Sequence, residues 1–369
     1  MAKGPPPVAT ENRSMIQTPS SLKPSGVSPE ASTSLTIVIV NWNGGEKLSR
    51  CLRSIRESRT TFPVKVIVVD NDSRDGSRER AAAEFPEFRV LNSGANLGFG
   101  RGNNFARPWV DTPLVLFLNP DTELFPDTLE KTVASLLSRP RVGMLGCQMR
   151  YPDGTIQELG LQWFPTPGRV FLELVAPGLL RRGPFSRWVP RHDPRRSGPV
   201  EKLYGGFLLI RKPVLDAAGW FDERYFMYAE DVDLSRTVRA LGWELYYDAD
   251  CSIIHACGAA SQKAPGGFSV LMKQRSVNQL IEKYQGPGAA RRHRRAVALA
   301  AGIRLAGLWL PRTVGQCLGP AAGRLEDSWR RSRLLWEWAW HGLEAEVPSQ
   351  PRLLPVDEMA RSAGVARIS

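Results

Sequence analysis

Three short apolar runs, each followed by polar residues, constrain the fold of this chain more than any other feature of its sequence. They read LTIVIVN, VKVIVVD and LVLFL, at Leu35–Asn41, Val64–Asp70 and Leu114–Leu118. Aliphatic, β-branched runs of this length are typical of strands buried on both faces of a parallel sheet. Between the first two runs, Leu48, Leu52 and Ile55 recur at helical spacing. Alternating strand and helix predict an α/β fold with a doubly wound sheet.

The polar residues at the ends of these strands predict a ligand site. Asn41 closes the first strand, Asp70 and Asn71 close the second, and Asn119-Pro120-Asp121 follows the third. In open α/β sheets, ligands bind at the carboxyl edge of the strands. We therefore expect these side chains to lie at one edge of the sheet, around a bound ligand.

The second half of the chain predicts further elements. Tyr204–Arg211 has a strand pattern, and Asp231–Leu241 has a helical stripe that stops at Gly242. Glu244–His255 reads as two short strands, and amphipathic helices rich in Arg, Leu and Trp run from Arg291 to Trp340.

We divide the chain into four parts on this basis. Residues 1–34 are a disordered N-terminal segment, because they are polar and rich in Pro and Ser. Residues 35–285 form one α/β domain, with a Pro-, Gly- and Arg-rich insert at 161–200. Residues 286–347 form a basic amphipathic helical region, and residues 348–369 a flexible tail.

The net charge of +12 favours an anionic partner, which leaves nucleic acid, anionic lipid or a phosphorylated substrate open. The chain carries no signature of an RNA-recognition, zinc-finger or helix-turn-helix protein, so we expect no nucleic acid. The chain has five scattered cysteines and no apolar secretory signal. No apolar run in it approaches the ~20 residues that a membrane-spanning helix needs. These features favour a cytoplasmic protein.

Asn119-Pro120-Asp121 has two interpretations. An acid directly after a buried strand can hold Mg²⁺ or Mn²⁺ through oxygen. Asn, Pro and Asp are also turn formers, so these three residues alone favour a simple turn.

Glu230-Asp231-Val232-Asp233 opens a predicted helix, where acids are stabilised by the helix dipole. The functional alternative is a general base that the helix end keeps ionised at neutral pH. Because residues two apart do not share a helix face, at most one of Asp231 and Asp233 faces a substrate.

His255 has three interpretations. It is a core histidine, or a zinc ligand together with Cys251 and Cys257, or a neutral imidazole on the same cation as Asp121. The zinc site lacks an obvious fourth ligand. The Gly- and Asn-rich stretch at residues 94–104 matches neither the dinucleotide fingerprint nor the P-loop, which disfavours a dehydrogenase or a P-loop ATPase.

Taken together, five motifs in order resemble family 2 glycosyltransferases, and among them the bacterial rhamnosyltransferase-like branch. The motifs, spread over residues 35–285, are TIVIVNWNG at 36–44, VVDNDS at 68–73, NLGFGRGNN at 96–104, LNPDT at 118–122 and GWFDERYFMYAEDVDL at 219–234.

This resemblance implies a GT-A fold with a doubly wound mixed sheet, inversion at the anomeric carbon, and a Mg²⁺- or Mn²⁺-bound dTDP- or UDP-sugar donor. It makes residues 35–285 the catalytic domain and places the insert at 161–200 on the acceptor side. It implies that Asp231 is the catalytic base and that Asp121 and His255 bind the metal. It places seven residues around the donor nucleotide: Asn41, Asn43, Asp70, Asn71, Asn96, Asn103 and Asn119.

The expected function is therefore transfer of a sugar, with L-rhamnose favoured by resemblance alone, onto a glycan or lipid-linked acceptor in polysaccharide synthesis. The Arg- and Trp-rich helices predict peripheral binding to the inner face of the cell membrane. The alternative is a helical cap packed on the catalytic domain, with Trp inward and Arg solvated. The alternatives are an inactive nucleotide-sugar-binding protein of the same fold and, with less support, a nucleic-acid-binding protein.

Overall fold

The computed structural model describes residues 33–158, 160–177, 180, 189–256, 267–315 and 321–342. Its described strands form one nine-stranded sheet in the order β3-β2-β1-β4-β8-β6-β9-β5, with β7 beside β9. The strands are β1 (Leu35–Asn41), β2 (Val64–Asp70), β3 (Arg89–Asn92), β4 (Leu114–Leu118), β5 (Thr122–Leu124), β6 (Val142–Arg150), β7 (Gly198–Val200), β8 (Phe207–Arg211) and β9 (Glu244–His255).

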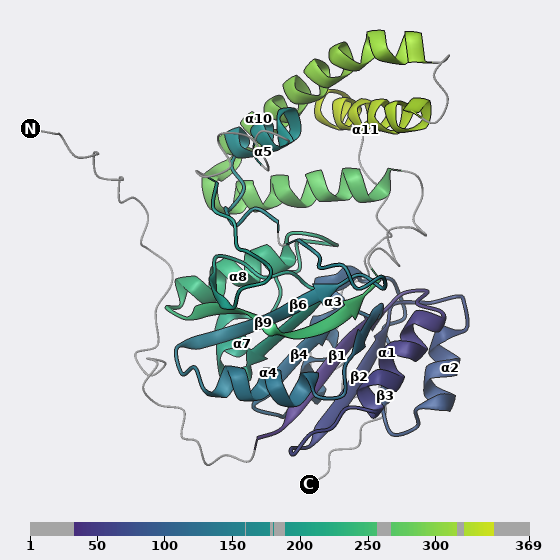
Figure 1. The fold of residues 1–369 in the computed structure, drawn as a ribbon, viewed down its shortest axis with the longest axis vertical. Helices are drawn as coiled ribbons and strands as arrows, with labels where there is room; N and C mark the ends of the chain where they lie inside the picture. Colours follow the sequence, from purple (N-terminus) through teal and green to yellow (C-terminus); the bar gives the residue numbers. More distant parts are fainter. Residues whose placement is uncertain are drawn as a thin grey trace, which may run out of the picture.

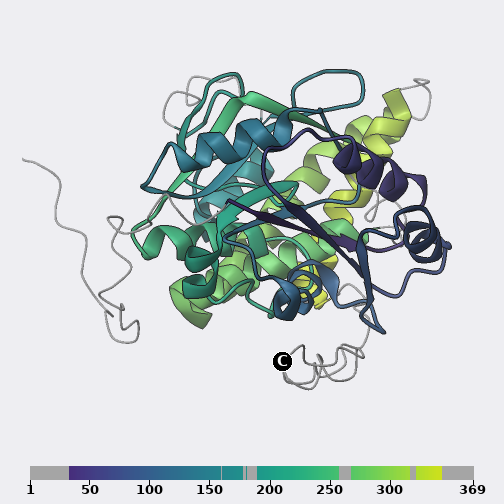
Figure 2. The same ribbon diagram turned by 90° about the horizontal axis from the view of Figure 1, so that it is seen from below.

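Helices cover both faces of this sheet (Figures 1 and 2). One apolar core lies under α1 (Glu46–Arg56), α2 (Ser77–Glu84) and α4 (Thr128–Leu137). The other lies on the opposite face, under α3 (Gly98–Phe105), the short helix η1 (Arg107–Trp109), α7 (Lys212–Ala218) and α8 (Glu230–Ala240). In β1, Ile37 and Ile39 belong to the first core and Val38 to the second, as strand alternation requires. The predicted doubly wound α/β fold is confirmed.

The three apolar runs become the centre of the sheet. β2, β1 and β4 are adjacent and parallel, and Asn41 is paired with Asp70 in the register of β1 and β2. β8 then runs antiparallel to β4, so the sheet is mixed. The polar ends of β1, β2 and β4 therefore meet at one edge, as the sequence predicted.

The prediction of two strands within Glu244–His255 is wrong, because β9 is one continuous strand. Its pairing with β6 shifts register between Cys147 and Gln148, so the ladder resumes at Ser252 after Asp248. Such a bulge bends a strand without ending it. The last residues of β9 then pair with β5, which sets His255 opposite Thr122.

The C-terminal helices form a separate layer (upper part of Figure 1). α10 (Phe268–Gly315) starts well before residue 286 and changes direction at Gly286, whose φ is 78°. Its two halves pack with α5 (Pro167–Val175), from the insert, and with α11 (Ala321–His341) around a third apolar core. No helix in the described part of the chain is long and apolar enough to cross a membrane. The predicted disordered segment, except Thr33 and Ser34, and the predicted tail lie outside the described residues.

Candidate active site

A cavity of about 950 Å³ opens at the carboxyl edge of the central strands. Its polar end is lined by Asn71, Asn96, Asn119, Asp121, Asp231 and His255, all of them predicted site residues. The insert, the first half of α10 and residues 226–228 line its other, largely apolar end. Its size suits a small-molecule ligand.

Four predicted donor-site residues lie behind the cavity wall instead of on it: Asn41, Asn43, Asp70 and Asn103. The Asn41 amide donates to Asp70 Oδ1 over 2.8 Å, and both side chains are fully buried. Asn43 Oδ1 accepts from the Arg74 backbone N–H over 2.8 Å. Asn103 Nδ2 donates to the Phe99 carbonyl over 3.0 Å. In this structure these polar groups are satisfied within the protein and hold the loops in shape.

The Gly-rich stretch at residues 94–104 allows close backbone packing beside the same cavity. Gly98 has φ of 79°, and a Cβ there would lie 2.1 Å from the Phe226 carbonyl oxygen. This close approach lets the Phe99 N–H donate to that carbonyl over 2.8 Å. Asn96 Oδ1 caps the turn by accepting from the Gly98 N–H. The glycines thus join α3 to the segment that leads into α8, which explains a Gly-rich motif with no dinucleotide fingerprint.

Asp121 and His255 come together because β5 pairs with the end of β9. Asp121 Oδ1 lies 3.4 Å from His255 Nε2, and both side chains are largely buried. Gln157 holds the ring: its amide donates to the His255 carbonyl, and its Oε1 lies 3.1 Å from His255 Nδ1. Nδ1 therefore carries the proton, which leaves the lone pair on Nε2. The Asn119 amide, 3.4 Å away, faces this lone pair.

The donor set of this pair fits a divalent cation. A carboxylate oxygen and an imidazole lone pair converge, and two neighbouring ligands of an octahedral Mg²⁺ or Mn²⁺ site stand about 3 Å apart. Such ions take their remaining ligands from water and substrate phosphates. Within the described residues no cluster of three or more His, Cys, Asp or Glu could hold a metal by itself. The zinc alternative gains no support, since Cys251 is buried in the core and Cys257 lies outside the described residues.

Asp231 stands at the start of α8, after Tyr228 and Ala229, which both have positive φ. Its Oδ2 accepts from the Gly205 N–H over 2.9 Å, and its Oδ1 from the Val232 N–H over 2.8 Å. Burial raises the pKa of Asp231, although these hydrogen bonds oppose the shift. The helix end, which the sequence alone predicts, favours the ionised form, whereas burial acts in the opposite direction. A base whose pKa is moved toward neutrality is better matched to proton transfer.

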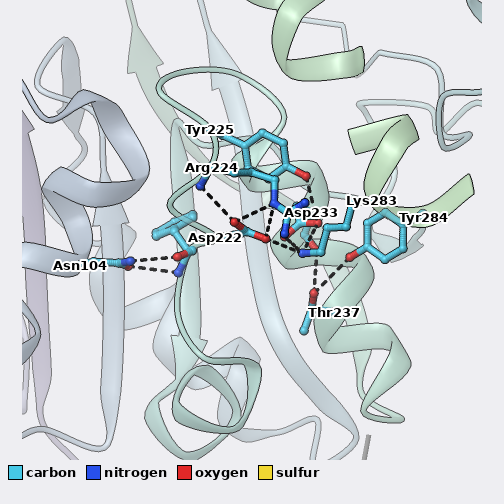
Figure 3. Close-up of polar contacts among 9 residues, drawn as sticks. Asn104, Asp222, Arg224, Tyr225, Asp233, Thr237, Lys283 and Tyr284 are labelled. Atoms are coloured by element: carbon cyan, nitrogen blue, oxygen red, sulfur yellow. Dashed lines mark hydrogen bonds and ion pairs between the residues drawn. The ribbon is translucent and has the colours of Figure 1, made fainter. Parts of the chain in front are cut away.

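The neighbouring acids of α8 differ from Asp231. Glu230 also lines the cavity, and burial together with the Asp231 charge raises its pKa well above the ordinary value. Asp233 instead points to α10, where both of its oxygens accept from Lys283 Nζ over 2.8 Å (Figure 3). Asp231 faces the cavity and Asp233 does not.

Gly205 and Gly206 lie between the acid and the Asp121–His255 pair. Gly205 donates to Asp231, and the Gly206 carbonyl accepts from the Asn119 N–H over 3.2 Å. The Asp231 carboxylate thus lies against Gly205 and the His255 ring against Gly206, and both side chains line one cavity. Sequence reasoning missed the roles of this glycine pair, Gln157 and the cavity-lining Lys202, because their partners Asp231, His255 and Trp163 are distant in the chain.

Known proteins resemble this chain in sequence and in fold. The family described as "Glycosyl transferase family 2" matches residues 36–213. An N-acetylglucosaminyl-diphospho-decaprenol L-rhamnosyltransferase of Mycobacterium tuberculosis is 31% identical over 268 residues, which cover 68% of this chain and 85% of that protein. Rhamnosyltransferase WbbL of Escherichia coli is 25% identical over 226 residues, 59% of this chain and 82% of that protein.

A solved structure shares the fold. The mannosyltransferase PcManGT of Pyrobaculum calidifontis, in complex with GDP-Man and Mn²⁺, has a TM-score of 0.50 and 17% identity. The match covers 85% of this chain and 89% of that one. The fold is thus of the GT-A type, and the predicted family resemblance is confirmed. With its motifs, fold and relatives in agreement, the chain belongs to glycosyltransferase family 2 and is similar to its bacterial rhamnosyltransferases.

Proposed function

We propose that this protein is an inverting, metal-dependent glycosyltransferase that moves a sugar from a nucleotide diphosphate donor to an acceptor hydroxyl. One observation carries the proposal: Asp231 and the Asp121–His255 pair lie on the two sides of Gly205-Gly206, in one cavity. A base and a cation site so close together suit a displacement with the acceptor on one side and the diphosphate on the other.

Asp231 takes the acceptor proton as the acceptor oxygen attacks the anomeric carbon. The bond from that carbon to the diphosphate oxygen breaks, and the diphosphate leaves with the electron pair. A single displacement of this kind inverts the configuration at the anomeric carbon. Asp121 and His255 would hold Mg²⁺ or Mn²⁺, which when bound stabilises the negative charge of the leaving diphosphate.

The relatives guide the choice of substrates. Two of them are named rhamnosyltransferases, and the name of one includes a diphospho-decaprenol. Their names support L-rhamnose as the first sugar to test and a lipid-linked glycan as acceptor, while a dTDP- or UDP-linked donor rests on the family resemblance. Galactose, glucose and N-acetylglucosamine are further donors to test.

We further propose that the C-terminal helices bind the inner face of an anionic membrane. Arg291, Arg295, Leu299 and Ile303 are all exposed and recur every four residues along α10, so they share one helix face. Along α10 this face begins with basic residues and continues with apolar ones. Trp309 and Trp340 are also exposed, to 60% and 67%. Arginines beside exposed Leu, Ile and Trp suit an interface of anionic headgroups and acyl chains. The alternative of a cap with all Trp inward fits Trp338 but not these two tryptophans.

The direct experiment incubates the full chain with a panel of nucleotide sugars, Mn²⁺ and a lipid-diphosphate-linked acceptor sugar, and measures product by mass spectrometry. We expect turnover with one or two donors and inversion at the new bond. Tight binding of a nucleotide sugar with neither transfer nor hydrolysis for any donor would favour the inactive sugar-binding alternative.

A further inference from the structure

Two lysines line the cavity that also contains Asp231 and the Asp121–His255 pair. Lys202 precedes Gly205 by three residues and is 8% exposed, and Lys273 projects from the first half of α10. Burial lowers the pKa of Lys202, and the nearby Lys273 charge lowers it further, while Glu173 and Asp231 act in the opposite direction. Both lysines therefore line the same cavity, Lys202 as a buried side chain and Lys273 as an exposed one.

The hydrogen-bonding capacity of these lysines is largely unused. Lys202 Nζ donates to the Trp163 carbonyl over 2.9 Å, one of the three hydrogen bonds that an ammonium group can give. Among the described residues, neither lysine forms an ion pair. The two nearest acids are satisfied by other donors: Glu173 by the Trp163 indole N–H, and Asp231 by backbone N–H groups.

An apolar surface continues the cavity beyond the lysines. It is lined by Val170 and Leu174 of α5, Leu180, and Phe268, Val277 and Leu280 of α10. Gln274 lies in the same wall, and its buried Oε1 has no hydrogen-bond partner in the described structure. The cation pair, the base, the two lysines and this apolar surface thus line one cavity.

We propose that Lys202 and Lys273 form a phosphate subsite for an acceptor that carries a phosphate or diphosphate between its sugar and an apolar chain. The inference rests on the proposed function, since it assigns the donor diphosphate to the Asp121 end and the acceptor to the Asp231 end. A buried, under-used ammonium beside a second cation suits a multiply charged anion. The apolar wall suits the first isoprene-like units of the chain.

The test measures binding alone, by calorimetry on the full chain in EDTA, so that no metal is available for the donor site. The probes are geranyl diphosphate, geraniol and inorganic pyrophosphate. We expect geranyl diphosphate to bind at least about tenfold more tightly than either other probe. Lys202→Met and Lys273→Met should each weaken its binding by about tenfold or more and leave geraniol within twofold.

Lys65→Met, which removes an exposed lysine far from the cavity, is the matched control and should change nothing. Lys273 is exposed, so its replacement tests the subsite even if Lys202→Met fails to fold. Equal binding of geranyl diphosphate and geraniol, or no effect of Lys273→Met, would overturn the proposal. If both lysines instead govern binding to phosphatidylglycerol vesicles more than to geranyl diphosphate, the anion is a bilayer headgroup and the acceptor subsite is refuted.

UDP binding in Mn²⁺ separates this inference from the proposed function. We expect both lysine variants to keep the wild-type affinity for UDP. A loss of UDP binding equal to the loss of geranyl diphosphate binding would assign the lysines to the donor, against the subsite. Retained transfer by variants with unchanged geranyl diphosphate binding would refute the subsite and leave the glycosyltransferase assignment in place.

Discussion

Lys283 joins the C-terminal helices to the helix that carries the proposed base, and its removal tests how α8 is held. Lys283 Nζ lies 2.8 Å from Asp222 Oδ2 and 2.8 Å from each oxygen of Asp233 (Figure 3). The side chains are 24%, 22% and 4% exposed, respectively. Lys283→Met keeps the apolar stem and leaves Asp222 and Asp233 facing each other without this cation.

The expected cost follows from burial. Removing one partner of a fully buried ion pair costs about 3–5 kcal/mol. Lys283 is about a quarter exposed, and Asp222 keeps Arg224 as a partner, so we expect a lower value, about 2–3 kcal/mol. At about 2.1 cal/mol/K per residue, the unfolding entropy of a 369-residue chain is about 0.8 kcal/mol/K, so this loss lowers Tm by roughly 3–4 °C.

Thermal denaturation at pH 7.5 provides the assay, with Lys65→Met as control. Lys65 pairs with Asp111 on the surface, where a pair contributes at most about 1 kcal/mol. Lys283→Met/Asp233→Asn should recover part of the loss, because the buried charge is removed with its partner. If Lys283→Met lowers Tm no more than Lys65→Met does, the cluster does not hold α8 and the reasoning is refuted.

The pH dependence gives a second check on the same cluster. Although burial opposes it, hydrogen bonds from Lys283 and Arg224 hold the pKa of Asp222 below its ordinary value. The stability that ionised Asp222 gives the folded protein is therefore present above the pKa of Asp in the unfolded chain, about 3.9. It is lost as the pH falls through the lower pKa of Asp222 in the folded protein. The Tm gap between wild type and Lys283→Met should narrow below about pH 4, and a constant gap would contradict this origin.

Three further predictions concern the site and the membrane face. Asp121→Ala should remove the Mn²⁺ dependence of UDP binding measured by calorimetry, and wild-type activity that survives exhaustive chelation would exclude the cation role. Because burial raises the pKa of Asp231, kcat/KM should fall with decreasing pH through a midpoint above the ordinary 3.9; a midpoint at or below that value would contradict this environment. Leu299→Gln and Trp340→Ala should each lower co-sedimentation with anionic vesicles severalfold at unchanged Tm, whereas equal co-sedimentation would favour a structural cap.

Point variants suit the membrane question better than removal of the tail after Gln285. The second half of α10 contributes Val297 and Ala301 to the apolar core that α5 and Phe226 also share. Deleting it would expose that core next to the cavity. A truncated chain that failed to bind vesicles would therefore not separate lost membrane contact from lost structure.

The central part of the sheet could be predicted from the sequence because short continuous segments of the chain determine it. Each of β1, β2 and β4 is an apolar run that only burial on both faces accommodates, and parallel pairing then brings Asn41 beside Asp70. The continuity of β9 could not be predicted in this way. Its polar middle, Asp248 to Asp250, looks like a turn, whereas a bulge opposite β6 accommodates it.

The site was less predictable because its partners are distant in the chain. His255 is oriented by Gln157, 98 residues away, and Asp231 accepts from Gly205, 26 residues away. Sequence could place Asp231 at a helix start but not reveal its burial, which sets the direction of its pKa shift. The roles of Asn41 and Asp70 in donor binding stay predictions, since both side chains are paired behind the cavity wall.

The most direct test of the account compares transfer by the wild type and by Asp231→Asn, with the donor and acceptor that the panel identifies. Asparagine keeps the shape of Asp231 but cannot take the acceptor proton. We predict a fall in kcat of about 10²–10⁴, with UDP affinity in Mn²⁺ within twofold of wild type. A variant that transfers sugar within a few-fold of the wild-type rate would contradict the assignment of Asp231 as the base.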